Sequence, residues 1–143
     1  MSTEENKAVV RRFFEEYNKH NLDGLEELCA PDYVWHGPAG FGDMDLAAMK
    51  QVMPTWFAAL PDLHWTVDDL IAEGDKVVSR YTCRATHQGE LMGVPATGKV
   101  VTATAILISR FAGGKCVEDW EEADMLGLFQ QLGAIPQMAQ TGA

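Results

Sequence analysis

The chain has 143 residues, which is enough for one domain with a hydrophobic core and short for two. Hydrophobic residues make up 47% of it and charged residues 22%, which is the composition of a globular protein rather than of a disordered one. A net charge of −10 argues against nucleic acid and anionic membranes as partners, because both bind clustered cations.

The three cysteines, Cys29, Cys83 and Cys116, are widely spaced and form no CxxC pair. Their spacing predicts neither a disulfide framework nor a metal site, so we expect small buried thiols in a reducing cytoplasm. The first residues carry acids and lack the apolar segment of a signal peptide. No run approaches the roughly 18 apolar residues of a membrane span, so we expect a cytoplasmic protein.

Helical periodicity dominates the beginning of the chain. Ser2 and Glu5 form a capping-box pattern, and apolar residues follow at helical spacing over 9–17. This pattern predicts a first helix that ends between residues 18 and 21. A short second helix is expected over 23–29, ended by the Ala-Pro pair that follows it.

A short strand over 33–36 and a flexible loop over 39–43 come next. An apolar stripe over 46–60 then predicts a helix, but Pro54 lies inside it. An interior proline costs about 3 kcal/mol, so we expect a kink or a restart of the helix there. A bend would let three side chains close over one end of a cavity: Met53, Trp56 and Phe57.

Strand patterns fill most of the remaining sequence. Residues 63–67 alternate, Gly74 and Asp75 mark a turn, and the odd-numbered residues over 77–87 share one largely apolar strand face. A connection rich in glycine and proline, 88–99, leads to the last hairpin.

That hairpin pairs an apolar strand, 100–111, with an acidic strand, 115–123, across a Gly-Gly turn. Asp124 is placed to cap a final helix that ends at Gly133, before a frayed tail. Helices come first and consecutive antiparallel strands follow, so the fold class is α+β. We expect one domain over 1–143, with an ordered core of about 3–134, in which helices cover a cone-shaped, curved antiparallel sheet.

The acidic strand holds the main candidate for chemistry. A carboxylate that points from it into an apolar cavity would have a raised pKa and could serve as a general acid or base. Asp119 and Glu121 share one face of the strand, and Trp120 lies on the other. Alternation alone does not decide which face is inward, so Glu121 is either a buried acid or a solvated one.

Several motifs are similar to those of the SnoaL-like polyketide cyclases, members of the nuclear-transport-factor-2-like superfamily. They are HxGxLxGxPxTGK over 87–99, a Gly-Lys turn, and DxxGxxxQLG over 124–133. The segment 11–33 resembles the family's opening helices as well. The resemblance implies a cystatin-like roll and a cofactor-free acid–base enzyme that closes a polyketide ring by intramolecular aldol condensation.

Carried over by position, the resemblance places the family's catalytic aspartate on Glu121. The family's assisting histidine and glutamine fall on Leu107 and Ala105, and a pocket asparagine falls on Trp35. Leu107 and Ala105 favour an alternative function, a ligand-binding or dimerising module without catalysis. The retained carboxylate favours the enzyme.

Other residues complete the predicted site. Asp119 could orient or perturb Glu121, although a surface charge is the simpler interpretation. His87 could donate a hydrogen bond to a substrate carbonyl, or be an ordinary histidine near a turn. The expected ligand is a small apolar carbonyl compound, with no cofactor. The side chains expected to line its pocket are Tyr17, Trp35, His36, Met53, Trp56, Phe57, Tyr81 and Leu107.

The expected outer face of the sheet is also informative. Along strand 100–111 it would carry Thr102, Thr104, Ile106 and Ile108. Such a face is too apolar to be left in water, so the sequence predicts a homodimer, as the resemblance does.

Overall fold

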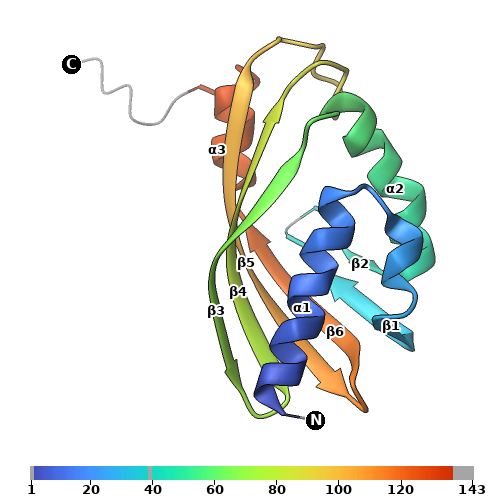
Figure 1. Cartoon of the computed structure of the whole chain (residues 1–143). Coiled ribbons are helices and arrows are strands. Elements are labelled where there is room, and N and C mark those ends of the chain that lie inside the picture. The colour runs from blue at the N-terminus through green and yellow to red at the C-terminus, as the bar shows by residue number, and fades with distance from the viewer. Residues whose placement is uncertain (1, 39, 137–143) are drawn as a thin grey trace.

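The structure is a computed structural model that describes residues 2–38 and 40–136. Helices pack against a strongly curved sheet whose long central strands bend across the whole molecule (Figure 1). The elements follow the chain as α1 (Thr3–Asn18), a short 3-10 helix η1 (Leu22–Leu25), β1 (Cys29–His36), β2 (Asp43–Met44), α2 (Leu46–Ala59), β3 (His64–Glu73), β4 (Lys76–Thr86), β5 (Val100–Ala112), β6 (Lys115–Ala123) and α3 (Met125–Gln131).

Helix α1 begins at the predicted capping box. The Ser2 hydroxyl accepts from the Glu5 backbone N–H at 3.1 Å, and the Glu5 carboxylate accepts from the Ser2 N–H at 3.3 Å. The helix ends at Asn18, whose side-chain amide bonds both backbone groups of Trp65 in β3. Its apolar side, with Phe13 and Phe14 buried, packs on β3 and β4.

The prediction of a second helix over 23–29 is wrong after its first turn. Only η1 is helical, and β1 already begins at Cys29 and includes Pro31. A proline is tolerated in a strand where its missing N–H is not needed, and the register of β1 shifts between Cys29 and Val34. Strand β2 was not expected either: Asp43, assigned to a loop, pairs with His36.

Helix α2 is continuous, and the expected restart at Pro54 is absent. Asp45 caps its first turn by accepting from the Ala48 N–H at 2.8 Å. The proline leaves one carbonyl of the preceding turn without an intrahelical donor, but the helix runs on to Ala59.

The strands form one six-stranded sheet with the order β2-β1-β6-β5-β4-β3 in the described residues. The pairs β3–β4, β4–β5 and β5–β6 are antiparallel, as predicted. One pairing departs from the expected antiparallel sheet, because β1 pairs with β6 in parallel and the sheet is therefore mixed. Gly113 and Gly114 both have positive φ, which suits the tight turn that joins β5 to β6.

The α+β class is confirmed, and the helices and the concave side of the sheet enclose the core. None of the described helices is long and apolar enough to cross a membrane. The expected frayed tail falls on 137–143 and part of the expected loop on residue 39, which lie outside the described residues.

Candidate active site

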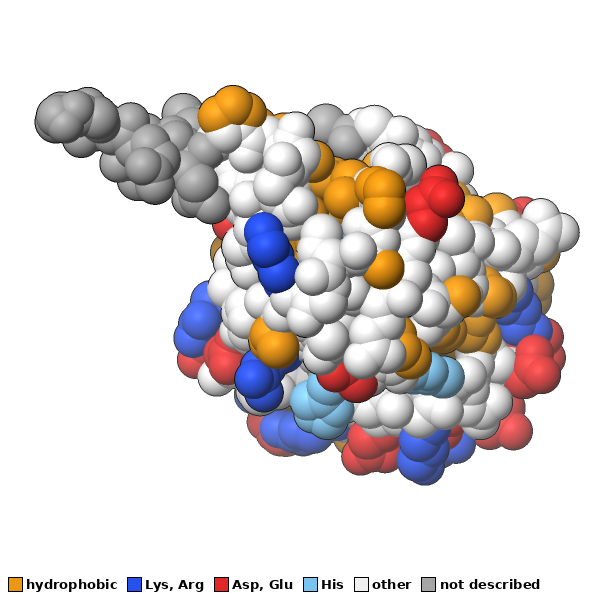
Figure 2. All heavy atoms as spheres, turned by 90° about the horizontal axis from the view of Figure 1, so that it is seen from above, with side chains coloured by type: hydrophobic (Ala, Val, Ile, Leu, Met, Phe, Trp, Pro, Cys, Tyr) orange, Lys and Arg blue, Asp and Glu red, His pale blue; other side chains and the backbone are white. Residues whose placement is uncertain are grey.

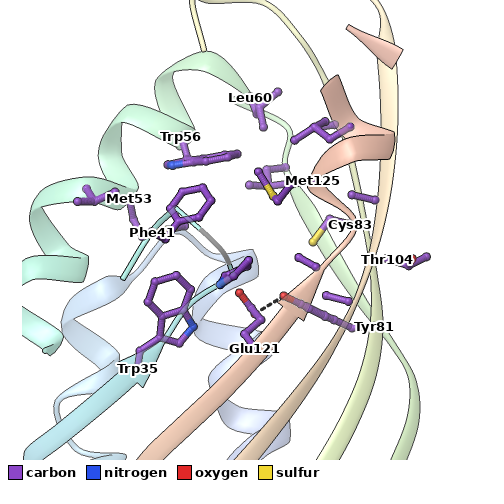
Figure 3. A pocket seen from close by; sticks show the side chains of 18 of the residues that line it. Trp35, Phe41, Met53, Trp56, Leu60, Tyr81, Cys83, Thr104, Glu121 and Met125 are labelled. Atoms are coloured by element: carbon purple, nitrogen blue, oxygen red, sulfur yellow. Dashed lines mark hydrogen bonds between the residues drawn. The ribbon is translucent and has the colours of Figure 1, made fainter. Parts of the chain in front are cut away.

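The concave side of the sheet encloses an apolar cavity of about 160 Å³, here called the outer chamber. One buried water needs roughly 10–15 Å³, so this chamber can hold a small organic molecule. Its walls come from α2, α3, the sheet, and the loop residues Pro38 and Phe41 (Figure 3). The lining side chains labelled in Figure 3 include Trp35, Phe41, Met53, Trp56, Leu60, Tyr81, Cys83, Glu121 and Met125.

Hydrophobic side chains form a patch on the end of the molecule that is seen from above (Figure 2). Hydrophobic side chains gather in the upper half of that view, and most lysine, arginine and acidic side chains lie around its lower and lateral margins (Figure 2). Helix α3, which contributes Met125 and Leu128 to the outer chamber, lies near this end (Figure 1).

Glu121 belongs to the wall of the outer chamber. It lies on β6 opposite Leu107 of β5, and this register turns Asp119 and Glu121 inward while Trp120 stays 36% exposed on the outer face. Strand alternation left open which face of β6 is inward, and the pairing of β6 with β5 shows that it is the face of Glu121. In Figure 3 the Glu121 carboxylate points into the cavity and accepts a hydrogen bond from the Tyr81 hydroxyl.

Burial dominates the electrostatics of Glu121. Removal from water raises the pKa of its carboxyl from 4.5 to about 7, and the charge of Asp119 adds to the rise. Hydrogen bonds from the Tyr81 hydroxyl and the Trp35 indole oppose the rise without cancelling it. A carboxyl with a pKa near 7 can both accept and return a proton at neutral pH.

A second cavity of about 100 Å³, here called the inner chamber, lies between α1 and the sheet. Trp35, Tyr81 and Glu121 line both chambers, so Glu121 stands at their boundary. The inner chamber has more polar groups in its wall than the outer one. Its lining is Phe13, Phe14, Tyr17, Trp35, Met49, Met53, Trp65, Tyr81, Leu107, Ser109, Asp119 and Glu121.

Asp119 is 4% exposed and lies in the wall of the inner chamber. The Tyr33 hydroxyl donates to its Oδ2 at 2.5 Å, and the Cys116 thiol lies 3.5 Å from its Oδ1. Burial raises the pKa of Asp119, although hydrogen bonds from Ser109, Tyr33 and Cys116 work against the rise. The surface-charge interpretation of Asp119 is therefore wrong.

Of the predicted site residues, Tyr17, Trp35, Met53, Trp56, Tyr81, Leu107, Asp119 and Glu121 line one or both chambers. Three others line neither. His36 lies between Asp43 and Glu118, whose hydrogen bonds raise its pKa, and Phe57 stacks on His20. His87 is fully buried under the 88–99 connection, where its Nδ1 accepts from the Thr97 N–H at 3.2 Å.

Sequence reasoning missed two groups that shape the site. Tyr33, which holds Asp119, was assigned to a strand, but no local signal pairs it with a residue so distant in the chain. Phe41 was assigned to a flexible loop, yet its ring lies 6.3 Å from Trp35 and 6.0 Å from Trp56 and forms part of the chamber wall. The only sequence signal for the role of Phe41 was the position of an aromatic residue between two glycines.

The described residues contain no group of three or more His, Cys, Asp or Glu side chains placed to hold a metal ion. Cys83 lies in the outer chamber, but burial raises its pKa to about 12. Its thiol is therefore protonated at neutral pH and is a poor nucleophile. The ionisable group of this chamber that is suited to chemistry near pH 7 is Glu121.

Comparison with known proteins gives a consistent picture. A family model described as SnoaL-like polyketide cyclase matches residues 8–132. The aklanonic acid methyl ester cyclase DnrD of Streptomyces peucetius is 29% identical to this chain over 132 residues, which cover 87% of this chain and 88% of DnrD.

Solved structures extend the similarity to the fold. AclR from Streptomyces galilaeus, described as a candidate hydroxylase, has a TM-score of 0.87 at 34% identity and covers 97% of this chain and 87% of its own. IdmH from Streptomyces antibioticus, described as a candidate polyketide cyclase, has a TM-score of 0.82 at 34% identity over 90% of this chain and 98% of its own.

Proposed function

This chain belongs to the SnoaL-like polyketide cyclase family, and we propose that it closes a ring in an apolar compound with several carbonyl groups by an intramolecular aldol reaction. Glu121 is the proposed general base and acid. One observation carries this assignment: a buried carboxyl with a pKa of about 7 lies in the wall of an apolar chamber.

The proposed reaction needs one proton to leave and one to return. The Glu121 carboxylate takes a proton from a carbon between two carbonyl groups, and the electron pair of that C–H bond becomes a delocalised enolate. The enolate carbon then attacks a ketone carbon of the same molecule, so a C–C bond forms and the ketone π pair moves to oxygen. The resulting alkoxide takes the proton back from Glu121. Atoms are conserved, and the product is an isomer of the substrate.

The surrounding side chains support a single-carboxylate mechanism. A proton between two carbonyls is already acidic, so the protein mainly holds the folded substrate in a reactive arrangement. Tyr81 and Trp35 orient the Glu121 carboxylate by donating hydrogen bonds to it. Asp119 contributes negative charge that helps keep the proton affinity of Glu121 high. His87 has no role in this proposal, because it lines neither chamber.

Replacement of Glu121 by glutamine tests the assignment. Aklanonic acid methyl ester, which the name of the relative DnrD specifies, is the first substrate to try. We expect Glu121→Gln to lower kcat by about 10²–10⁴-fold, the typical contribution of a general acid–base group, with little change in substrate affinity. The matched control is Glu122→Gln, one residue along β6 and exposed on the outer face; it should keep full activity.

Two outcomes would contradict the assignment. Full activity of Glu121→Gln would remove Glu121 from the mechanism. Binding without turnover by the unchanged protein, over a panel of polycarbonyl compounds, would favour the non-catalytic ligand-binding alternative.

We also propose that the protein is a cytoplasmic homodimer. Support for the dimer comes from an apolar row that crosses the outer face of the sheet, where Val78, Ile108 and Trp120 are register partners. Ile106 beside this row is 49% exposed. The free cysteines, two of them buried, agree with a reducing compartment.

A further inference from the structure

The placement of the Trp35 ring decides whether Glu121 has its second hydrogen-bond donor. The first donor, the hydroxyl of Tyr81, comes from a buried side chain of β4, a strand with a neighbour on either side. Trp35 is instead the last residue but one of β1, and its ring contacts Phe41 in the loop that follows the strand. Figure 3 shows the nitrogen of this ring on the side that faces Glu121. The residues of that loop therefore bear on where the indole N–H points.

Gly37, the first residue after β1, leaves the space that the Trp35 ring occupies. A methyl group built on Gly37 would lie 2.3 Å from Cη2 and 2.5 Å from Cζ3 of Trp35. Carbon atoms in contact stay about 3.5–4.0 Å apart, so no residue with a Cβ fits beside the ring as it lies. The φ of Gly37 is outside the left-handed region, so the backbone conformation does not require glycine there. The requirement at this position is one of space.

A methyl group at this position would displace the ring rather than the loop. The loop backbone is held by two hydrogen bonds of 3.1 Å, from the Gly37 N–H to the Gly42 carbonyl and from the Phe41 N–H to the Pro38 carbonyl. Cη2 and Cζ3 are at the far end of the Trp35 side chain, which lines both chambers and has open space to move into. To make the 2.3 Å contact an ordinary one, the ring must move by about 1 Å. A shift of this size lengthens the indole hydrogen bond beyond the usual range of about 2.7–3.2 Å.

We propose that Gly37 is a positioning residue for Glu121: because it has no side chain, the Trp35 ring can lie where its indole N–H donates to the Glu121 carboxylate. Gly37 itself lines neither chamber. Its effect on turnover rests on the proposed function, in which Glu121 is the base. Its effect on the carboxylate does not.

Titration of Glu121 tests the proposal without any substrate. Protein labelled with carbon-13 at the glutamate carboxyl groups is followed by NMR over a range of pH, and the Glu121 signal is the one that Glu121→Gln lacks. In the unchanged protein its midpoint should lie at about 7. The hydrogen bond from Trp35 stabilises the ionised form, so Gly37→Ala should raise the midpoint by about one pH unit.

Two further variants separate the ring contact from general effects of the loop. Gly40→Ala strains the same loop, because Gly40 has a φ of +94°, but its methyl group would meet no atom within 4 Å. This variant should leave the midpoint unchanged. Trp35→Phe removes the indole N–H and also the two ring carbons that a methyl group on Gly37 would meet. It should raise the midpoint by a similar amount, and adding Gly37→Ala to it should cause no further change.

The same pair of substitutions covers a failure to fold. If Gly37→Ala alone does not fold, we expect Gly37→Ala combined with Trp35→Phe to fold, because the smaller ring leaves room for the methyl group. A double variant that also fails to fold would overturn the proposal.

Three results of the titration would overturn it as well. They are an unchanged midpoint in folded Gly37→Ala, an equal rise in Gly40→Ala, or a further rise when Gly37→Ala is added to Trp35→Phe. The proposed function fails separately. If Glu121→Gln keeps full activity while the midpoints follow the expected order, Gly37 still positions the Glu121 carboxylate, and only the assignment of Glu121 as the base is refuted.

Discussion

At the scale of single residues, the cost of burying Glu121 is tied to its proposed use. A pKa that rises from 4.5 to about 7 corresponds to about 3 kcal/mol of disfavoured ionisation at high pH. This is the net cost, because the hydrogen bonds from Tyr81 and Trp35 already offset part of the larger cost of removing the carboxylate from water. The protein therefore holds the Glu121 carboxylate in a state in which proton uptake is favourable.

This state predicts the direction of the pH dependence. Below pH 7 the Glu121 carboxyl is mostly protonated and cannot act as a base, and above pH 7 it is ionised. We therefore expect kcat/KM to rise from pH 5 to pH 8 with a midpoint near 7. A pH–rate profile with a midpoint near the ordinary value of 4.5 would mean that the reacting carboxyl is exposed to water.

Glu121 and Tyr33 show how much of the candidate site could be predicted from the sequence. The acidic strand and the family motif identified Glu121, because both are local patterns. Its orientation depends on pairing with β5, and the identity of its neighbours depends on β1 and β4 as well. Tyr33 has no local pattern that relates it to Asp119, so only the folded structure could reveal it.

At the scale of elements, long patterns were predicted well and short ones poorly. The well-predicted elements are α1, α2 and β3 to β6, in which the apolar pattern repeats several times. A pattern of this length predicts the element even where one residue, such as Pro54, does not fit it. The segment from Cys29 to Pro31 has no such periodicity, and its proline suggested the end of a helix. Its strand conformation comes from pairing with β6, an interaction between residues nearly ninety positions apart.

The contact between α1 and β3 gives a prediction at this scale. Asn18 donates to the Trp65 carbonyl at 3.0 Å and accepts from its N–H at 2.7 Å, and so covers one position on an edge strand. Asn18→Ala removes both hydrogen bonds and should lower the free energy of unfolding by about 2 kcal/mol.

Urea denaturation would measure this loss as a lower midpoint. The control is Glu15→Ala, an exposed position on the last turns of the same helix, which should change stability little. Equal midpoints for Asn18→Ala and the unchanged protein would show that water replaces the amide at no cost.

At the scale of the whole molecule, the curved sheet has two faces with different surroundings. The concave face surrounds the two chambers, and the outer face carries the row of Val78, Ile108 and Trp120. His36 stacks on Trp120 at 5.6 Å and extends this row into β1. The order of the predicted elements was enough to predict the α+β class and the curved sheet. It did not predict the parallel pairing of β1 with β6.

The outer face predicts the assembly state. We expect sedimentation analysis to give a dimer, because stable interfaces typically bury about 800 Å² on each partner and a curved face of several strands offers such an area. Ile106→Glu places a charge in the centre of this face and should shift the protein to monomers. The control is Met92→Glu, which changes a 57% exposed residue in the connection between β4 and β5. A monomer before any substitution would refute the proposed interface.

The parallel pairing of β1 with β6 has a consequence for biosynthesis. Strand β1 is made long before its partner β6, which is completed only at Ala123. During translation the nascent chain therefore carries Trp35 and Tyr33 without the carboxyls that they will contact. Pairings between such distant segments form slowly, and the pocket can close only after the ribosome has released β6.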